Sequence, residues 1–92
     1  MSKYGETNST KEVLLLMAKK IRAIRTEKRM TQESLSNKSG VAYASIRKFE
    51  STGLISFISL LKICKALGRL DEFESILQPD DLDRKRKLFD GN

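Results

Sequence analysis

The sequence predicts an all-α protein, a compact five-helix bundle that contains a helix-turn-helix. Helix-capping residues recur along the chain, apolar residues fall at helical spacing, and Gly40, Gly53 and Gly68 separate the segments. The chain has one proline, and no alternating pattern typical of a β-strand extends beyond a few residues. Its 92 residues suit one domain with a single small core.

The first helix is expected to begin after a capping box and to end near Lys28. Ser9 is the expected N-cap, and the side chain of Glu12 can reach back to its amide. Basic residues, Arg25 among them, occupy much of the polar side. Apolar residues at helical spacing define the face that we expect to join the core. These residues are Val13, Leu14, Met17, Ile21 and Ile24.

The next two helices, expected over about 32–38 and 42–51, form the helix-turn-helix. Thr31 caps the first, Gly40 ends it in the left-handed conformation, and Val41 anchors the turn in the core. In this motif the second helix enters the major groove of DNA. The helical residues expected in the core here are Leu35, Ile46 and Phe49.

Two further helices complete the predicted bundle. Ser56 caps the fourth, which ends at Gly68, and the fifth is expected over 70–77, before Pro79. The predicted organisation is a mobile N-terminus at 1–8, a DNA-binding domain at 9–78 and a charged C-terminal tail at 79–92.

Positive charge is concentrated in the N-terminal part of the chain. Residues 1–69 hold 14 Lys and Arg against 5 Asp and Glu, a balance of +9. Residues 70–92 hold 4 against 7, a balance of −3, and the whole chain carries +6. A basic domain suits a polyanionic partner, although a solvated helix surface would show the same charges.

The composition argues against catalysis. The chain has no His, so it has no histidine base or ligand, and its single cysteine, Cys64, can form neither an internal disulfide nor a Cys–His pair. No glycine-rich phosphate loop or metal-ligand spacing is present. We expect no catalytic residue, no metal and no cofactor, and Cys64 as a small buried residue. No apolar run suits a membrane span or secretory signal, so we expect a cytoplasmic bacterial protein that associates with the nucleoid when bound to DNA.

Three stretches carry a resemblance to a known family: GVAYASIRKFE, the Thr31-Gln32-Glu33 start before it and the Lys65-Ala66-Leu67-Gly68 end after it. Together they resemble the XRE-type helix-turn-helix family, the fold of phage repressors, over about residues 12–77. The resemblance implies that the first residues of the second motif helix read base edges and that flanking residues lie near them or on phosphate. The implied base readers are Ala42, Tyr43, Ala44 and Lys48, and the implied flanking or phosphate residues are Gln32, Ser45 and Arg47.

The chemistry of the base readers fits this role. Lys48 can donate to guanine O6 and N7, and Tyr43 can hydrogen-bond a base edge and pack on a thymine methyl, as Ala42 and Ala44 also can. The family often has Ser or Thr where Ala42 stands, so this helix gives up its N-cap, at a cost of about 1 kcal/mol. Lys48 as plain solvated surface is the alternative. Glu50 is expected to be structural and to pair with a basic residue of the first helix.

The segment that follows, FESTGLISFISLLKICKALGRLDEFESILQP, narrows the resemblance. Its Phe-Glu-x-Thr-Gly-x-Ile-Ser link and Ala-Leu-Gly-Arg-Leu-Asp-Glu-Phe junction resemble the HipB-type antitoxin of HipA-kinase toxin–antitoxin loci. The resemblance implies a homodimeric autorepressor that binds a palindromic operator in double-stranded DNA and restrains a HipA-like Ser/Thr kinase toxin. The acidic end, residues 71–83, would suit a basic partner.

Two alternatives stay open. One is a stand-alone phage or chromosomal repressor without a toxin partner, and the other is a protein-interaction module that has lost DNA binding. Dimerisation is expected because one such domain covers only one half-site. Apolar residues of the fifth helix and the tail are the expected dimer surface. These are Leu70, Phe73, Ile76, Leu77, Leu82, Leu88 and Phe89.

Overall fold

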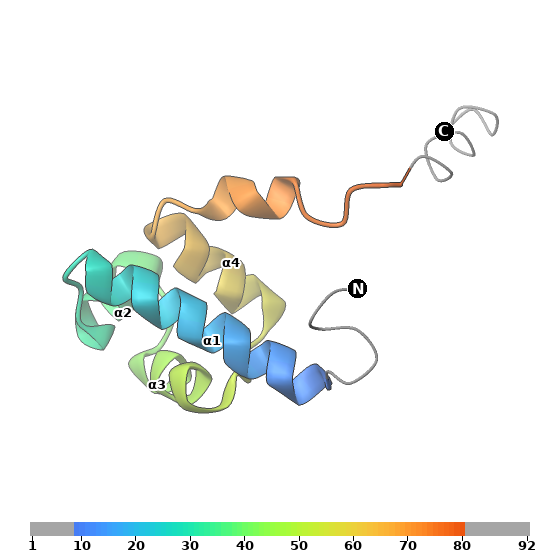
Figure 1. Ribbon diagram of the computed structural model, residues 1–92. Helices are drawn as coiled ribbons and strands as arrows, with labels where there is room; N and C mark the ends of the chain where they lie inside the picture. Colours follow the sequence, from blue (N-terminus) through green and yellow to red (C-terminus); the bar gives the residue numbers. More distant parts are fainter. Residues whose placement is uncertain (1–8, 81–92) are drawn as a thin grey trace.

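The computed structural model describes residues 9–80 (Figure 1). The predicted N-terminal segment 1–8 and residues 81–92 of the predicted tail lie outside this range. Within it the chain is helical and holds no strand, so the predicted all-α class is confirmed. The elements are α1 (Thr10–Glu27), α2 (Gln32–Ser39), α3 (Tyr43–Thr52), α4 (Phe57–Ala66) and the 3₁₀ helix η1 (Leu70–Glu74).

The prediction of five α-helices is wrong for the fifth. Only the short η1 forms there, it buries no residue, and Leu77 has a positive φ of 56° and is 93% exposed. Most helical stability in proteins comes from packing an apolar face. In this segment only Phe73 packs against the core, while Leu70 and Ile76 stay exposed. The segment therefore lacks the packing that would extend η1 into an α-helix.

The predicted N-caps are confirmed. The amide of Glu12 donates to Ser9 Oγ at 3.2 Å, and the Glu12 carboxylate accepts from the Ser9 amide, which completes the capping box. Thr31 Oγ1 accepts from the Ser34 amide and caps α2, and Ser56 Oγ accepts from the Ser59 amide and caps α4. Because these bonds are local, they fix where α1, α2 and α4 begin.

Two glycines explain how α3 joins its neighbours. Gly40 ends α2 with φ 78°, the left-handed conformation that the sequence predicts. Gly53 ends α3 with φ 82°, and a Cβ there would lie 2.7 Å from backbone atoms of Leu14. The link between α3 and α4 therefore passes directly against α1, and only glycine leaves room for that approach.

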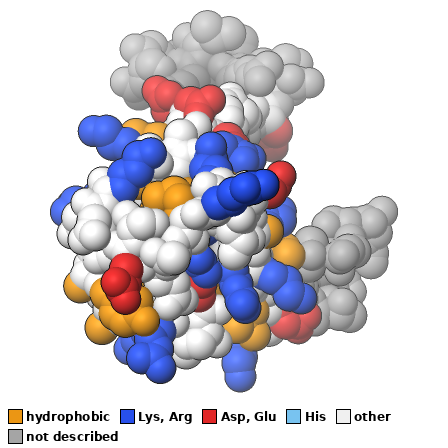
Figure 2. Space-filling view, turned by 90° about the vertical axis from the view of Figure 1, so that its left-hand side faces the viewer, with side chains coloured by type: hydrophobic (Ala, Val, Ile, Leu, Met, Phe, Trp, Pro, Cys, Tyr) orange, Lys and Arg blue, Asp and Glu red, His pale blue; other side chains and the backbone are white. Residues whose placement is uncertain are grey.

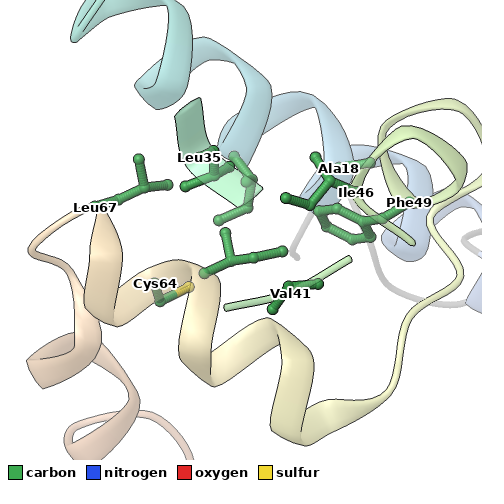
Figure 3. Close-up of a cluster of buried hydrophobic side chains, with 9 residues drawn as sticks. Ala18, Leu35, Val41, Ile46, Phe49, Cys64 and Leu67 are labelled. Atoms are coloured by element: carbon green, nitrogen blue, oxygen red, sulfur yellow. The ribbon is translucent and has the colours of Figure 1, made fainter. Parts of the chain in front are cut away.

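The core lies where α1, α2, α3 and α4 meet (Figure 3). Figure 1 shows α1 running obliquely across the molecule, with α3 below it, α4 above it and η1 along the upper side of α4. Within residues 9–80, nine apolar residues are buried: Ala18, Ile21, Leu35, Val41, Ile46, Phe49, Ile63, Cys64 and Leu67.

The predicted core face of α1 needs correction. Ile21 is buried, but Val13 and Met17 are 46% and 36% exposed. Ala18 and Arg25 are buried instead, and in Figure 3 the small side chain of Ala18 lies beside Ile46 and Phe49 of α3. The face of α1 that packs is thus set by its contact with α3 and is rotated from the face with the largest apolar side chains.

Candidate nucleic-acid interface

The turn between α2 and α3 is held by two serine side chains. Ser36 Oγ donates to the Val41 carbonyl at 2.6 Å, and Ser39 Oγ accepts from the Val41 amide at 3.1 Å. The Val41 side chain is buried, as predicted. With both backbone groups of Val41 bonded and its side chain in the core, the turn holds α3 in a defined direction relative to α2.

Helix α3 has one buried and one open side. Ile46 and Phe49 are 0% and 1% exposed, which confirms the spacing prediction. The opposite side is exposed, and Tyr43, Ala44, Arg47, Lys48 and Ser51 line a shallow hollow on it. Within residues 9–80 no hydrogen bond or ion pair engages the side chains of Tyr43, Arg47 or Lys48. Their donors are free to meet a ligand.

The start of α3 carries no side-chain cap, as the sequence predicts. Ala42 precedes the helix with φ −56° and ψ 139°, and it offers no oxygen to the first amides. The Ser45 and Ile46 amides donate to the Ala42 carbonyl, so the unsatisfied donors are those of the first residues. An open helix N-terminus carries partial positive charge and attracts anions such as phosphate.

A second cleft lies beside the hollow, between α3 and the start of α4. Ser45 and Lys48 line it from α3, and Ser56 and Ser59 line it from α4, with Leu54 and Ile55 between them. Lys48 thus borders both the hollow and the cleft. From the sequence, Ser56 is expected to cap α4, whereas Ser51 is not among the predicted site residues. Ser51 lies three residues after Lys48 on the same helical face, which is the sequence signal that could have identified it.

Gln32 lies in a different setting, next to a buried ion pair. The guanidinium of Arg25 donates from Nε to Glu50 Oε2 at 2.7 Å and from Nη2 to Glu50 Oε1 at 2.8 Å. Its Nη1 donates to the Met30 carbonyl at 2.7 Å. Gln32 Nε2 donates to Glu50 Oε1 at 3.0 Å. The predicted pairing of Glu50 with a basic residue of the first helix is therefore confirmed.

This network ties three helices together. The side chains of Arg25 and Glu50 are only 10% and 5% exposed. Burial alone raises the pKa of Glu50, but hydrogen bonds from Arg25 and Gln32, together with the charge of Arg25, outweigh it and hold this pKa below its usual value. Glu50 is thus charged at neutral pH, and its carboxylate fixes the α2 residue Gln32 relative to α3. One N–H of the Gln32 amide remains for another acceptor.

The charges on the surface follow the division expected from the sequence. Figure 2 shows Lys and Arg spread over the face at the left of Figure 1, while several Asp and Glu gather near its upper edge. In η1, Asp71, Glu72 and Glu74 are exposed. Residues 9–80 hold no cluster of three or more His, Cys, Asp or Glu that could bind a metal. No helix in this range is both long enough and apolar enough to cross a membrane.

Comparison with known proteins identifies the family. The family model described as Helix-turn-helix, of the XRE type, matches residues 21–73, which is more than half of the chain. This protein belongs to the XRE-type helix-turn-helix family. Domains of this family bind DNA, and the family is not one of enzymes. The chain is therefore a DNA-binding regulator of transcription. No curated protein and no solved structure matches the chain.

The XRE-type match sets the predicted site residues in their context. Tyr43, Ala44, Arg47 and Lys48 share the open side of α3, and Ser45 joins Lys48 in the neighbouring cleft. Ala42 is exposed directly before the helix. Gln32 is half-buried on Glu50, outside the hollow and the cleft. Their contacts with DNA stay predictions.

Proposed function

We propose that this chain is a sequence-specific transcriptional repressor that reads a palindromic operator as a homodimer. Ala42, Tyr43, Ala44 and Lys48 read bases in the major groove, and contacts along the phosphate backbone set the register. The flanking or phosphate residues are Gln32, Ser45 and Arg47.

One observation carries the proposal: the open side of α3 is basic, and the side-chain donors of Tyr43, Arg47 and Lys48 have no partner within residues 9–80. Arg47 and Lys48 project from a helix whose other side is locked into the core by Ile46 and Phe49. A rigid helix with free cationic donors on its outer side is the arrangement that major-groove reading requires.

The test is binding of the full chain to the DNA upstream of its own gene, with random-sequence DNA for comparison. We expect Lys48→Ala to lower the preference for the upstream DNA by about 1–3 kcal/mol. The matched control is Lys38→Ala, because Lys38 lies with Lys62 and Lys65 beside a separate hollow. This control should weaken binding to both DNAs alike. Equal specificity ratios for the two variants would rule out base reading by Lys48.

A second, narrower function is that of a HipB-type antitoxin that restrains a HipA-like Ser/Thr kinase. It rests on the sequence of the link and junction quoted above and on the exposed carboxylates of η1, Asp71, Glu72 and Glu74. Co-purification with the product of the adjacent gene tests it. We expect a stable complex that also binds the upstream DNA. The absence of a kinase-like gene beside this one would refute the antitoxin role and leave the stand-alone repressor.

A further inference from the structure

The link between α3 and α4 and the first turn of α4 expose large apolar side chains. Leu54, Phe57 and Ile58 are 52%, 62% and 64% exposed, and we call these three residues the link edge. A single exposed apolar residue is ordinary, whereas a contiguous exposed apolar patch is typical of an interaction site. Three within five residues, next to a helix start, form such a group.

Contacts within residues 9–80 cover little of the link edge. Helix α4 turns Ile63 and Cys64 into the core, so Ile58 lies on another side. Phe57 makes one ring contact, an edge-on approach to Phe73 with centroids 6.1 Å apart, and still leaves most of its surface open. Ser56 already caps α4, so the two apolar residues are not needed to begin the helix.

The link edge adjoins the reading side of α3. Leu54 lines the same cleft as Ser45 and Lys48. A molecule seated on the link edge would therefore lie beside the open side of α3. A two-fold axis beside the link edge would relate two copies of α3 to each other, and two half-sites on one DNA require such a symmetric pair.

The surroundings of the link edge carry both signs of charge. Lys62 is exposed one turn after Ile58 in α4, and Asp71, Glu72 and Glu74 are exposed in η1, which also supplies Phe73. A two-fold interface joins the same patch to itself, so charges of both signs allow the patch to complement itself. An acidic or basic partner of another kind would favour one sign only.

We propose that a second copy of this chain covers the link edge, with Leu54, Phe57 and Ile58 of each copy at the centre of the interface. The inference rests on the proposed homodimer and names its surface. The dimer surface proposed here lies at the start of α4, whereas the sequence suggested residues 70–77 and the tail. Lys62 of one copy then lies near the carboxylates of η1 in its partner.

The experiment measures the association of the full chain by analytical ultracentrifugation, without DNA. The test variant is Ile58→Glu, because a glutamate in the first turn suits the helix dipole and replaces a largely exposed side chain. The control is Leu77→Glu, which places the same charge on an exposed leucine of the segment after η1. Circular dichroism confirms that both variants keep the helical fold.

We expect a wild-type dimer, at least about a tenfold weaker dimer for Ile58→Glu, and an unchanged dimer for Leu77→Glu. A wild-type monomer at about 100 μM, where a dimer with a micromolar dissociation constant would have formed, overturns the proposal. The proposal is also overturned if Ile58→Glu leaves the dimer as strong as in the wild type, or if only Leu77→Glu dissociates the dimer. The readout involves no DNA, so it is independent of the Lys48→Ala test, and a monomer that still discriminates its upstream DNA would leave base reading intact.

Discussion

Arg25 and Glu50 lie 25 residues apart in the sequence, whereas Arg69 and Glu72 are separated by only three. The first pair is nearly buried, with side chains 10% and 5% exposed, and the second is open to solvent at 45% and 54%. In the open pair, the hydrogen bond from Arg69 lowers the pKa of Glu72. The same two residue types thus form one pair that joins three helices and one pair that stays within a single turn.

The difference shows what holds each region together. Around Arg25 and Glu50, four α-helices share one core, and the network adds Gln32 and the Met30 carbonyl. Around Arg69 and Glu72, η1 buries no residue. An exposed ion pair contributes little in water, while one member of a buried pair left alone is strongly destabilising. The difference between the two ion pairs can therefore be tested by removing the glutamate from each pair.

The largest effect is expected from Glu50→Ala. It leaves the buried Arg25 guanidinium without its carboxylate and removes the acceptor of Gln32. We expect a loss of about 3–5 kcal/mol in the free energy of unfolding, measured by urea denaturation. The double variant Arg25→Met with Glu50→Leu should recover most of it, since no charge is then buried alone.

The matched substitution in the other region is Glu72→Ala, which should leave the unfolding midpoint unchanged because its partner Arg69 is hydrated. If Glu50→Ala and Glu72→Ala shifted the midpoint equally, the contrast between the two pairs would be wrong.

A smaller loss of stability is expected when alanine replaces either of two glycines that share one backbone conformation. Gly53 and Gly68 have φ of 82° and 74°, so alanine costs about 1–2 kcal/mol at either position. At Gly53 the new Cβ also meets the backbone of Leu14 at 2.7 Å, whereas at Gly68 nothing lies within 4 Å. Gly53→Ala should therefore lower the melting temperature more than Gly68→Ala. The reverse order would mean that α1 does not pack against the α3–α4 link as closely as it does here.

Among the changes that lower stability, the smallest loss is expected when the pH of the wild type is lowered. The pKa of Glu50 is lower in the folded chain than its usual value. Its contribution to stability is therefore complete above the usual titration range of glutamate and is lost as the pH falls through the lowered folded pKa. Urea denaturation of the wild type below about pH 4 should show this loss. The Arg25→Met with Glu50→Leu variant should lose less over the same range, and parallel pH profiles would contradict the role of Glu50.

Much of the fold could be predicted from local sequence. Ser9, Thr31 and Ser56 begin helices, and Gly40 ends one, because each makes its decisive contact with a residue three or four positions away. The spacing of Ile46 and Phe49 likewise identified the buried side of α3, and so the open side where Lys48 lies. The absence of a cap at Ala42 could also be read directly.

Contacts between distant segments decided the rest. Burial of Ala18 and Arg25, in place of Val13 and Met17, depends on how α1 meets α3, and the pairing of Gln32 with Glu50 depends on how α2 meets α3. The fifth segment has the residues of a helix but too little packing surface to become one. Local sequence therefore determined where α1, α2 and α4 begin and where α2 ends, since those signals are hydrogen bonds within a turn. Only the tertiary structure decided which faces are buried and which side chains meet, because those depend on the close packing of segments far apart in sequence.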